Sequence, residues 1–500
     1  MTRRTASVLS LILLALAAAP GARAGDRPNI ILVLADDLGL YELGCYGQEK
    51  IRTPHIDRLA SEGMRFDRFY SASTVCAPAR ACLMTGLHTG HAPIRGNKEG
   101  GGWGPEEPEG QNPLPAESVT LAERMKDLGY ATAVFGKWGL GGPGSSGQPN
   151  FQGFDHFYGY NCQRVAHNYY PTHLWRNHDV DVLHNNDYFR AHQRITEPLA
   201  SEAEYAERYA GGDYAPQEIA LEAEHWIAAH KTDRPDDPFF IYYASIIPHV
   251  ALQVPDEWVD AYPREWDTEH YLGTKGYLPH PRPRAAYAGM ISYLDDVVGR
   301  LRAAVEAAGE ADNTLILITS DNGTTYAGGV DSKFFESLGE LRGHKTNLYE
   351  GGIRVPMVAW WPGRIEAGAS TDHVAQLPDL HPTLVEAAGG AAPDGLDGLS
   401  LMPTLTGDGE QAAHEHLYWE FPEGRQQQAV LLDGRWKAIR PNLKKGAPLE
   451  LYDLSRDPGE TKDLAGERPD VVAWARLRMR ESRVPSALFR IPALDEGTAP

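Results

Sequence analysis

This chain of 500 residues has few cysteines, few long apolar runs and a net charge that is negative. The chain has four cysteines, Cys45, Cys76, Cys82 and Cys162. They are too few and too scattered for a disulfide framework. If Cys76 has a separate role, at least one of the others must be unpaired. The net charge of −21 argues against a nucleic-acid partner and against a broad basic groove. A few local cations must therefore hold any anionic substrate.

The N-terminus has the parts of a secretory signal peptide. Basic residues precede an apolar run from Val8 to Ala19, and Ala22-Arg23-Ala24 has the small-x-small form of a signal-peptidase site. We predict a signal peptide over residues 1–24 and an exported protein, periplasmic or secreted. No later segment approaches the ~20 apolar residues of a transmembrane helix, so no membrane span is expected.

Four apolar runs are typical of buried parallel strands, and polar residues follow each run. The runs end at Asp36-Asp37, Lys137, His249 and Asp321-Asn322. Helical patterns lie between them, at residues 120–128, 217–230 and 287–308. This alternation predicts an α/β fold with a large, mostly parallel sheet sandwiched by helices. Since such sheets bind ligands beyond the carboxyl ends of their strands, we expect the polar endings to converge.

The chain also predicts a smaller C-terminal part. We place the main domain at residues 25–392 and the C-terminal subdomain at residues 393–500. In the second part, an Asp-Gly turn separates two strand-like runs within 429–440, and a further strand and an amphipathic helix follow at 449–454 and 470–482. These features indicate a small antiparallel sheet with one helix.

The two polar pairs after strands are candidate metal ligands. Their carboxylate and amide oxygens suit calcium or magnesium, and the four residues are Asp36, Asp37, Asp321 and Asn322. Either pair alone could equally form a turn or a helix cap, but two pairs favour a metal site. Lys137 and His249 also have simpler alternatives, as a surface charge and as a hydrogen-bonded core histidine.

Cys76 has three possible roles: a buried thiol, half of a disulfide, or a reactive group at the start of a helix. Pro78 suits a first helical turn, which would place Cys76 at a helix N-terminus that favours negative charge. Arg80, about one turn later, can point the same way and bind an oxyanion through two hydrogen bonds. A reactive Cys76 at a helix N-terminus, beside Arg80, therefore predicts a site that transfers an anionic group.

These residues resemble the motifs of type I sulfatases, in the alkaline-phosphatase-like superfamily. Cys76-Ala77-Pro78-Ala79-Arg80 has the C-x-P-x-R form of the sulfatase signature. Further blocks agree in their order along the chain, namely Asp36-Asp37-Leu38-Gly39, Gly136-Lys137-Trp138, Pro248-His249, Ser320-Asp321-Asn322-Gly323, Gly343-His344-Lys345 and Glu350-Gly351-Gly352-Ile353-Arg354-Val355-Pro356. An ordered set of this kind is far more specific than one motif.

The resemblance implies a sulfatase, arylsulfatase-like, in which a formylglycine-generating enzyme converts Cys76 to formylglycine. It also implies one calcium ion, held with the modified Cys76 by Asp36, Asp37, Asp321 and Asn322. The cations that would neutralise the sulfate are Arg80, Lys137 and Lys345. His249 would protonate the departing alkoxide.

One motif departs from the family pattern. Gly139 stands where the family has a histidine that contacts the hydrated formylglycine. Our hypothesis is that His167 replaces it, and its rivals are His88, His91 and His344.

The substrate is less fully specified. Residues 158–175 are rich in aromatic and polar side chains, which suit either a sugar ring or the packing of an irregular loop. We expect a sulfated carbohydrate, cut at a chain end. A phosphate or phosphonate ester hydrolase and a catalytically silent binding protein are the alternatives.

Overall fold

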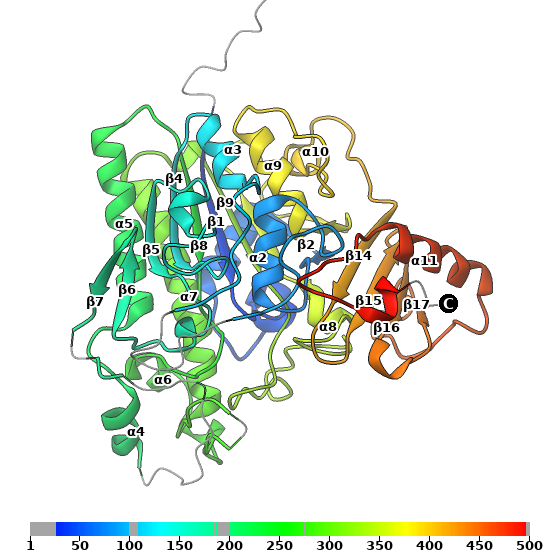
Figure 1. Ribbon diagram of the computed structural model, residues 1–500. Coiled ribbons are helices and arrows are strands. Elements are labelled where there is room, and N and C mark those ends of the chain that lie inside the picture. The colour runs from blue at the N-terminus through cyan, green and yellow to red at the C-terminus, as the bar shows by residue number, and fades with distance from the viewer. Residues whose placement is uncertain are drawn as a thin grey trace, which may run out of the picture.

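A ten-stranded sheet runs through the main body of the protein (Figure 1). The computed structural model describes residues 27–99, 109–184, 186–188, 192, 201–274 and 276–496. The predicted signal peptide lies outside the described residues. Within them, no helix is long and apolar enough to cross a membrane.

The centre of the sheet is parallel, as the sequence predicted. Its five central strands, in spatial order, are β9 (Thr314–Ser320), β1 (Asn29–Ala35), β8 (Phe239–Ala244), β4 (Ala131–Lys137) and β5 (His156–Tyr160). Antiparallel pairings appear only toward the edges. The outer strands are β12 (Ala369–Thr371), β2 (Met64–Phe66) and β11 (Met357–Trp360) beside β9, and β6 (His173–Arg176) and β7 (Asp179–Val182) beside β5.

Helices cover both faces of this sheet, which explains why the central strands are apolar without a break. Along β1, Ile31 and Val33 pack with one helix layer, whereas Ile30 and Leu32 pack with the other. The first layer contains α1 (Pro54–Glu62), α5 (Ala215–Asp233) and α7 (Pro283–Ala307). The second contains α2 (Cys76–Thr85), α3 (Leu121–Asp127) and α9 (Leu380–Ala387). The helices predicted at residues 120–128, 217–230 and 287–308 correspond to α3, α5 and α7.

The other short elements lie in connections. The helices are α4 (Glu202–Tyr209), α6 (Asp256–Asp260), α8 (Glu350–Ile353), α10 (Met402–Thr406) and α12 (Pro492–Asp495). A separate three-stranded sheet joins β10 (Arg354–Val355), β3 (Phe69–Tyr70) and β13 (Ala375–Gln376). The apolar run that was expected to continue to His249 ends as a strand at Ala244, so His249 lies in the following loop.

The C-terminal part forms the expected antiparallel sheet with one helix. Its strands are β14 (His416–Phe421), β15 (Gln427–Leu432), β16 (Trp436–Arg440) and β17 (Glu450–Asp453), and α11 (Pro469–Glu481) packs on one face. The turn between β15 and β16 uses Asp433 and Gly434, both with positive φ, as an Asp-Gly hairpin requires. The domain boundary at 393 stays a prediction.

A buried ion pair joins this small sheet to the main body. Lys437 on β16 is fully buried, and its Nζ lies 2.8 Å from Glu350 Oε1 and 3.5 Å from Glu460 Oε1. Glu350 begins α8, and Tyr70 Oη also donates a hydrogen bond of 2.8 Å to its Oε2. One lysine thus balances two buried carboxylates, one of them at the junction of the two sheets.

Replacing this lysine should therefore destabilise the protein strongly. In Lys437→Met, both carboxylates lose this lysine, although Arg354 Nη1 stays 3.8 Å from Glu350 Oε2. We expect the free energy of unfolding to fall by about 3–5 kcal/mol. Lys462→Met is the matched control, because Lys462 pairs with Glu467 at side chains that are 67% and 62% exposed, where about 1 kcal/mol or less is expected. Urea denaturation measures both, and equal losses would contradict the role of Lys437.

Candidate active site

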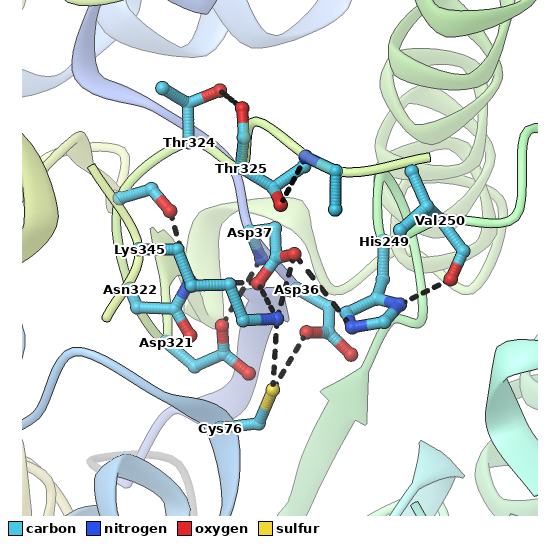
Figure 2. A network of polar contacts seen from close by, with 12 residues as sticks. Asp36, Asp37, Cys76, His249, Val250, Asp321, Asn322, Thr324, Thr325 and Lys345 are labelled. Carbon is cyan, nitrogen blue, oxygen red and sulfur yellow. Dashed lines mark hydrogen bonds and ion pairs between the residues drawn. The ribbon is translucent and has the colours of Figure 1, made fainter. Parts of the chain in front are cut away.

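The polar residues that follow the central strands do converge at one edge of the sheet (Figure 2). Asp36 and Asp37 follow β1, Asp321 follows β9, and Lys137 is the last residue of β4. In a parallel sheet the carboxyl ends of neighbouring strands lie side by side, so residues far apart in sequence become neighbours. The backbone N–H of Asp37, for example, donates to Asp321 Oδ1 at 3.2 Å.

Cys76 is the first residue of α2, and it is fully buried. Its Sγ lies 3.2 Å from Asp36 Oδ1, and the next backbone N–H, that of Ala77, donates to Asn97 Oδ1 at 3.0 Å. Burial, and then the charge of Asp36, raise the pKa of this thiol well above its usual range. The unmodified thiol is therefore neutral and a poor nucleophile at neutral pH. All four cysteines are free thiols in the structure.

Arg80 lies one turn later on α2 and is also fully buried. Its Nε and Nη2 donate to Asp321 Oδ2 at 3.1 and 2.9 Å, and Nη1 donates to the carbonyl of Lys137 at 2.5 Å. The guanidinium therefore links α2 to the ends of β9 and β4. The prediction that Cys76 and Arg80 point toward the same site is confirmed.

Two lysines complete the cationic side of the site. Lys137 Nζ lies 2.5 Å from Asp36 Oδ2, and both side chains are fully buried. Lys345 Nζ lies 2.7 Å from Asp37 Oδ1 and 3.9 Å from Cys76 Sγ. The backbone N–H of Lys345 donates to the carbonyl of Thr324 at 3.0 Å, which fixes this segment beside the end of β9.

The three carboxylates differ in their tendency to ionise. Burial alone would raise the pKa of Asp36, but the surrounding cations, Lys137 foremost, hold it well below its usual range. Burial, then the charge of Asp36, raises the pKa of Asp321 to about 7 despite Arg80. Burial also raises the pKa of Asp37. Burial therefore penalises the ionised forms of Asp37 and Asp321 even though three cations face the three carboxylates, and a bound divalent cation would favour these ionised forms.

The donor set fits such a cation. Asn322 Nδ2 donates to Asp37 Oδ1 at 2.7 Å, whereas the buried Asn322 Oδ1 has no hydrogen-bond partner among the described residues. A metal ligand is the role that this oxygen is free to fill. Asp36, Asp37, Cys76 and His249 offer ligand atoms that all lie within 4.8 Å of one another. Cys76 lies in this cluster, as the resemblance implied, whereas His249 was expected at this edge as the proton donor and not among the ligands.

His249 faces the carboxylates across the site. Its Nδ1 donates to the carbonyl of Val250 at 2.5 Å, so Nε2 is the nitrogen turned toward Asp37 Oδ2, 3.8 Å away. Burial, with Lys345 adding to it, lowers the pKa of His249 well below its usual value. The imidazole is therefore neutral until an anion enters the site, because a negative charge nearby favours the protonated ring.

His167, the hypothesised replacement for the missing histidine, packs on His249. The two rings are parallel within 6°, with centroids 3.9 Å apart, and His167 Nδ1 forms a hydrogen bond with His192 Nε2. Of the rivals, His88 and His91 pair with Asp397, whereas the ring of His344, the neighbour of Lys345, packs at a tilt of 40° on Tyr326. His167 is thus the nearest of these histidines to the proposed acid, although its contacts are with His249 rather than Cys76.

Gly139 has a structural reason to lack a side chain. Its φ is +75°, and a Cβ there would lie 2.8 Å from Cγ of Gln163. Gln163 is buried, its Nε2 donates to Asn97 Oδ1 at 3.4 Å, and its Oε1 has no partner among the described residues. Sequence reasoning missed Gln163, whose only signal was the glycine that makes room for it.

The chain is similar in sequence to known proteins over almost its whole length. Residues 28–391 match the family model described as Sulfatase, and residues 342–483 match that of N-sulphoglucosamine sulphohydrolase, C-terminal. Arylsulfatase A of Homo sapiens is 32% identical over 521 residues, which cover 95% of this chain and 92% of that protein. N-acetylgalactosamine-6-O-sulfatase of Bacteroides thetaiotaomicron is 29% identical over 516 residues, with coverage of 89% and 91%.

A solved structure agrees with this similarity in sequence. The crystal structure of Ps i-CgsB in complex with k-i-k-neocarrahexaose superposes with a TM-score of 0.72 at 25% identity, and it covers 94% of this chain and 95% of that chain. The chain therefore belongs to the sulfatase family and is a sulfuric ester hydrolase.

Proposed function

We propose that this enzyme removes sulfate from sulfated sugars, using formylglycine made from Cys76 and one calcium ion. The observation that carries the proposal is the placement of Cys76, buried at the start of α2 between Asp36 and Lys345. A neutral thiol there has no evident use as a nucleophile, whereas a modified side chain would meet both a metal site and a cation. The sugar class is supported by relatives whose names specify sulfated sugars.

The proposal includes maturation and location. A formylglycine-generating enzyme would act on residues 76–80 before α2 folds, because the completed helix buries every residue of this signature. Export to the periplasm or the medium follows from the N-terminal segment.

Hydrated formylglycine, once made from Cys76, would supply the nucleophilic oxygen for attack on sulfur and a second hydroxyl for the later release of sulfate. In the structure Cys76 Sγ stands in for that oxygen. Asp36, Asp37, Asp321 and Asn322 would hold calcium, which polarises a sulfate oxygen. Arg80, Lys137 and Lys345 supply positive charge where the sulfate oxygens gain charge in the transition state.

The leaving group requires a proton, because a sugar alkoxide is a strong base. His249 Nε2 is the candidate donor, since Nδ1 is already committed to the carbonyl of Val250. The negative charge of a bound sulfate ester would favour the protonated imidazole, and the proton would then pass to the departing oxygen.

The first test is the mass of the peptide that contains position 76, from protein produced with a formylglycine-generating enzyme. We expect the aldehyde, together with a higher kcat/KM for 4-nitrophenyl sulfate than for 4-nitrophenyl phosphate. Cys76→Ala should lose at least about 1,000-fold in kcat. Cys82→Ala, also buried on α2, is the control and should retain activity.

The outcomes separate the alternatives. A thiol at position 76, under conditions that convert a control sulfatase, would contradict the mechanism. A preference for phosphate would favour the phosphate or phosphonate ester hydrolase. Converted, calcium-loaded protein that hydrolyses no ester in a broad panel would favour the silent binding protein.

Calcium should stabilise the folded protein, because it binds the native site but not the unfolded chain. At 100 times its Kd, the gain in free energy of unfolding is about 2.7 kcal/mol. We expect the Tm to rise with CaCl2 and fall back with a chelator, and Asn322→Ala to remove most of this shift. Asn313→Ala, outside the site, is the control and should keep it. A shift that survives in Asn322→Ala would exclude this residue as a ligand.

Substitution of His249 and substitution of His167 should slow the reaction in ways that depend differently on the substrate. His249→Ala should slow sulfated sugars by about 10²- to 10⁴-fold and 4-nitrophenyl sulfate far less, since nitrophenolate leaves without a proton. If His167 is the base of the second step, His167→Ala should slow both substrates alike, because that step is common to all esters. Turnover that is unchanged in His167→Ala would show that the assignment is wrong.

A further inference from the structure

A hollow of about 380 Å³ is lined in part by the loop that follows Asn322, at residues 326–331. Its walls come from three segments that are distant in sequence, residues 268–271, the start of α7, and residues 326–331. The lining residues include Glu269, His270, Tyr271, Arg284, Tyr326 and Asp331. None of these residues has a role in the reaction described above.

The loop that forms one wall begins at the reaction centre. Thr324 accepts a hydrogen bond from the backbone of Lys345, and Figure 2 shows Thr324 and Thr325 close to that lysine. Further along, Gly328 packs on Val250, the residue that fixes the ring of His249, since a Cβ on Gly328 would lie 2.6 Å from Cβ of Val250. The loop that lines one wall of the hollow therefore also contacts the neighbour of the proton donor.

The opposite wall also reaches the proton donor. Tyr271 pairs with His280 as an isolated antiparallel bridge, which folds the segment between them back on itself. Tyr271 packs on Gly329 near the base of this fold, and Tyr277 places its ring centroid 6.0 Å from that of His249. Both segments that line the hollow thus continue to the surroundings of His249, the side of the site on which a leaving group would lie.

Tyr326 presents an aromatic ring at the edge of this space. It is 55% exposed, although most tyrosines of the described chain are buried, and its ring centroid lies 4.0 Å from that of His344. This contact fixes one part of the ring and leaves the rest open. Exposed aromatic faces of this kind bind the C–H faces of sugars, while nearby polar groups bind the hydroxyls.

The charges of the hollow argue against a second sulfate. Arg284 is the cation in its described lining, and its Nε and Nη2 donate to Asp331 Oδ2 at 3.0 and 2.7 Å. Its Nη1 donates to the carbonyl of Trp266 at 2.6 Å, so the guanidinium is already neutralised and satisfied. Glu269 adds a negative charge, which would repel a sulfate.

We propose that this hollow binds an uncharged sugar residue joined to the sulfated one, with Tyr326 as its stacking platform. The proposal rests on the proposed function, because it takes a sulfated sugar as the substrate. The enzyme then selects sulfated sugars by the neighbour they carry, and an oligosaccharide end is a better substrate than a free sulfated monosaccharide.

The experiment compares three substrates: 4-nitrophenyl sulfate, galactose 6-sulfate, and a disaccharide that joins galactose 6-sulfate to one unsulfated galactose. We expect kcat/KM to be at least ten-fold higher for the disaccharide than for the monosaccharide. Tyr326→Ala should remove most of this ratio, and Tyr326→Phe should keep it, because the ring is retained. Phe151→Ala is the control, since Phe151 is equally exposed, at 56%, on a turn outside the hollow.

The failures of the two proposals can be told apart. Hydrolysis of 4-nitrophenyl sulfate with equal kcat/KM for the two sugars, or with no hydrolysis of either, would overturn the subsite and leave the sulfatase activity intact. A ratio that survives in Tyr326→Ala would overturn the role of Tyr326. A disaccharide with a second sulfate on the added galactose should gain nothing, and a ten-fold gain would overturn the assignment of an uncharged sugar.

Discussion

The balance of buried charge at the carboxyl end of the sheet is the constraint on which the site depends. Asp36, Asp37 and Asp321 would repel one another if they stood alone in a water-free environment. Arg80, Lys137 and Lys345 lie among them and offset this repulsion charge for charge. A divalent cation bound by the carboxylates would leave the site net positive, which favours a sulfate. One arrangement of charges thus accounts for both the metal site and the anion site.

The fold produces this arrangement because the charged groups come from several elements that are far apart in sequence. Strands β1, β4 and β9 end at the same edge, and α2 brings its N-terminus to that edge with Cys76 at its first position. Arg80 then connects the helix to two strand ends through its three hydrogen-bonding nitrogens. A buried charge cannot be tolerated without its partners, so the strand ends, the helix and the loop of Lys345 must fold together.

Much of this could be predicted from the sequence. The apolar runs that end at Asp36, Lys137 and Asp321 already identified buried parallel strands and one shared edge, because strand period and burial are local properties. The Asp-Gly turn at Asp433 predicted its hairpin for the same reason. The position of His249 in a loop rather than at a strand end was not predictable, since an apolar run continues beyond the last strand hydrogen bond.

The sequence by itself determined the fold class, the family motifs and the set of residue types that carry the chemistry. Only the tertiary structure decided which of them meet: that Asn322 Oδ1 lacks a partner, that His167 stacks on His249, and that Gln163 fills the space at Gly139. It also decided that Tyr326 lines the hollow and packs on His344, the neighbour of Lys345. The physical reason is that hydrogen bonding, burial and ring contacts between distant segments depend on packing, which leaves no local pattern in the order of the residues.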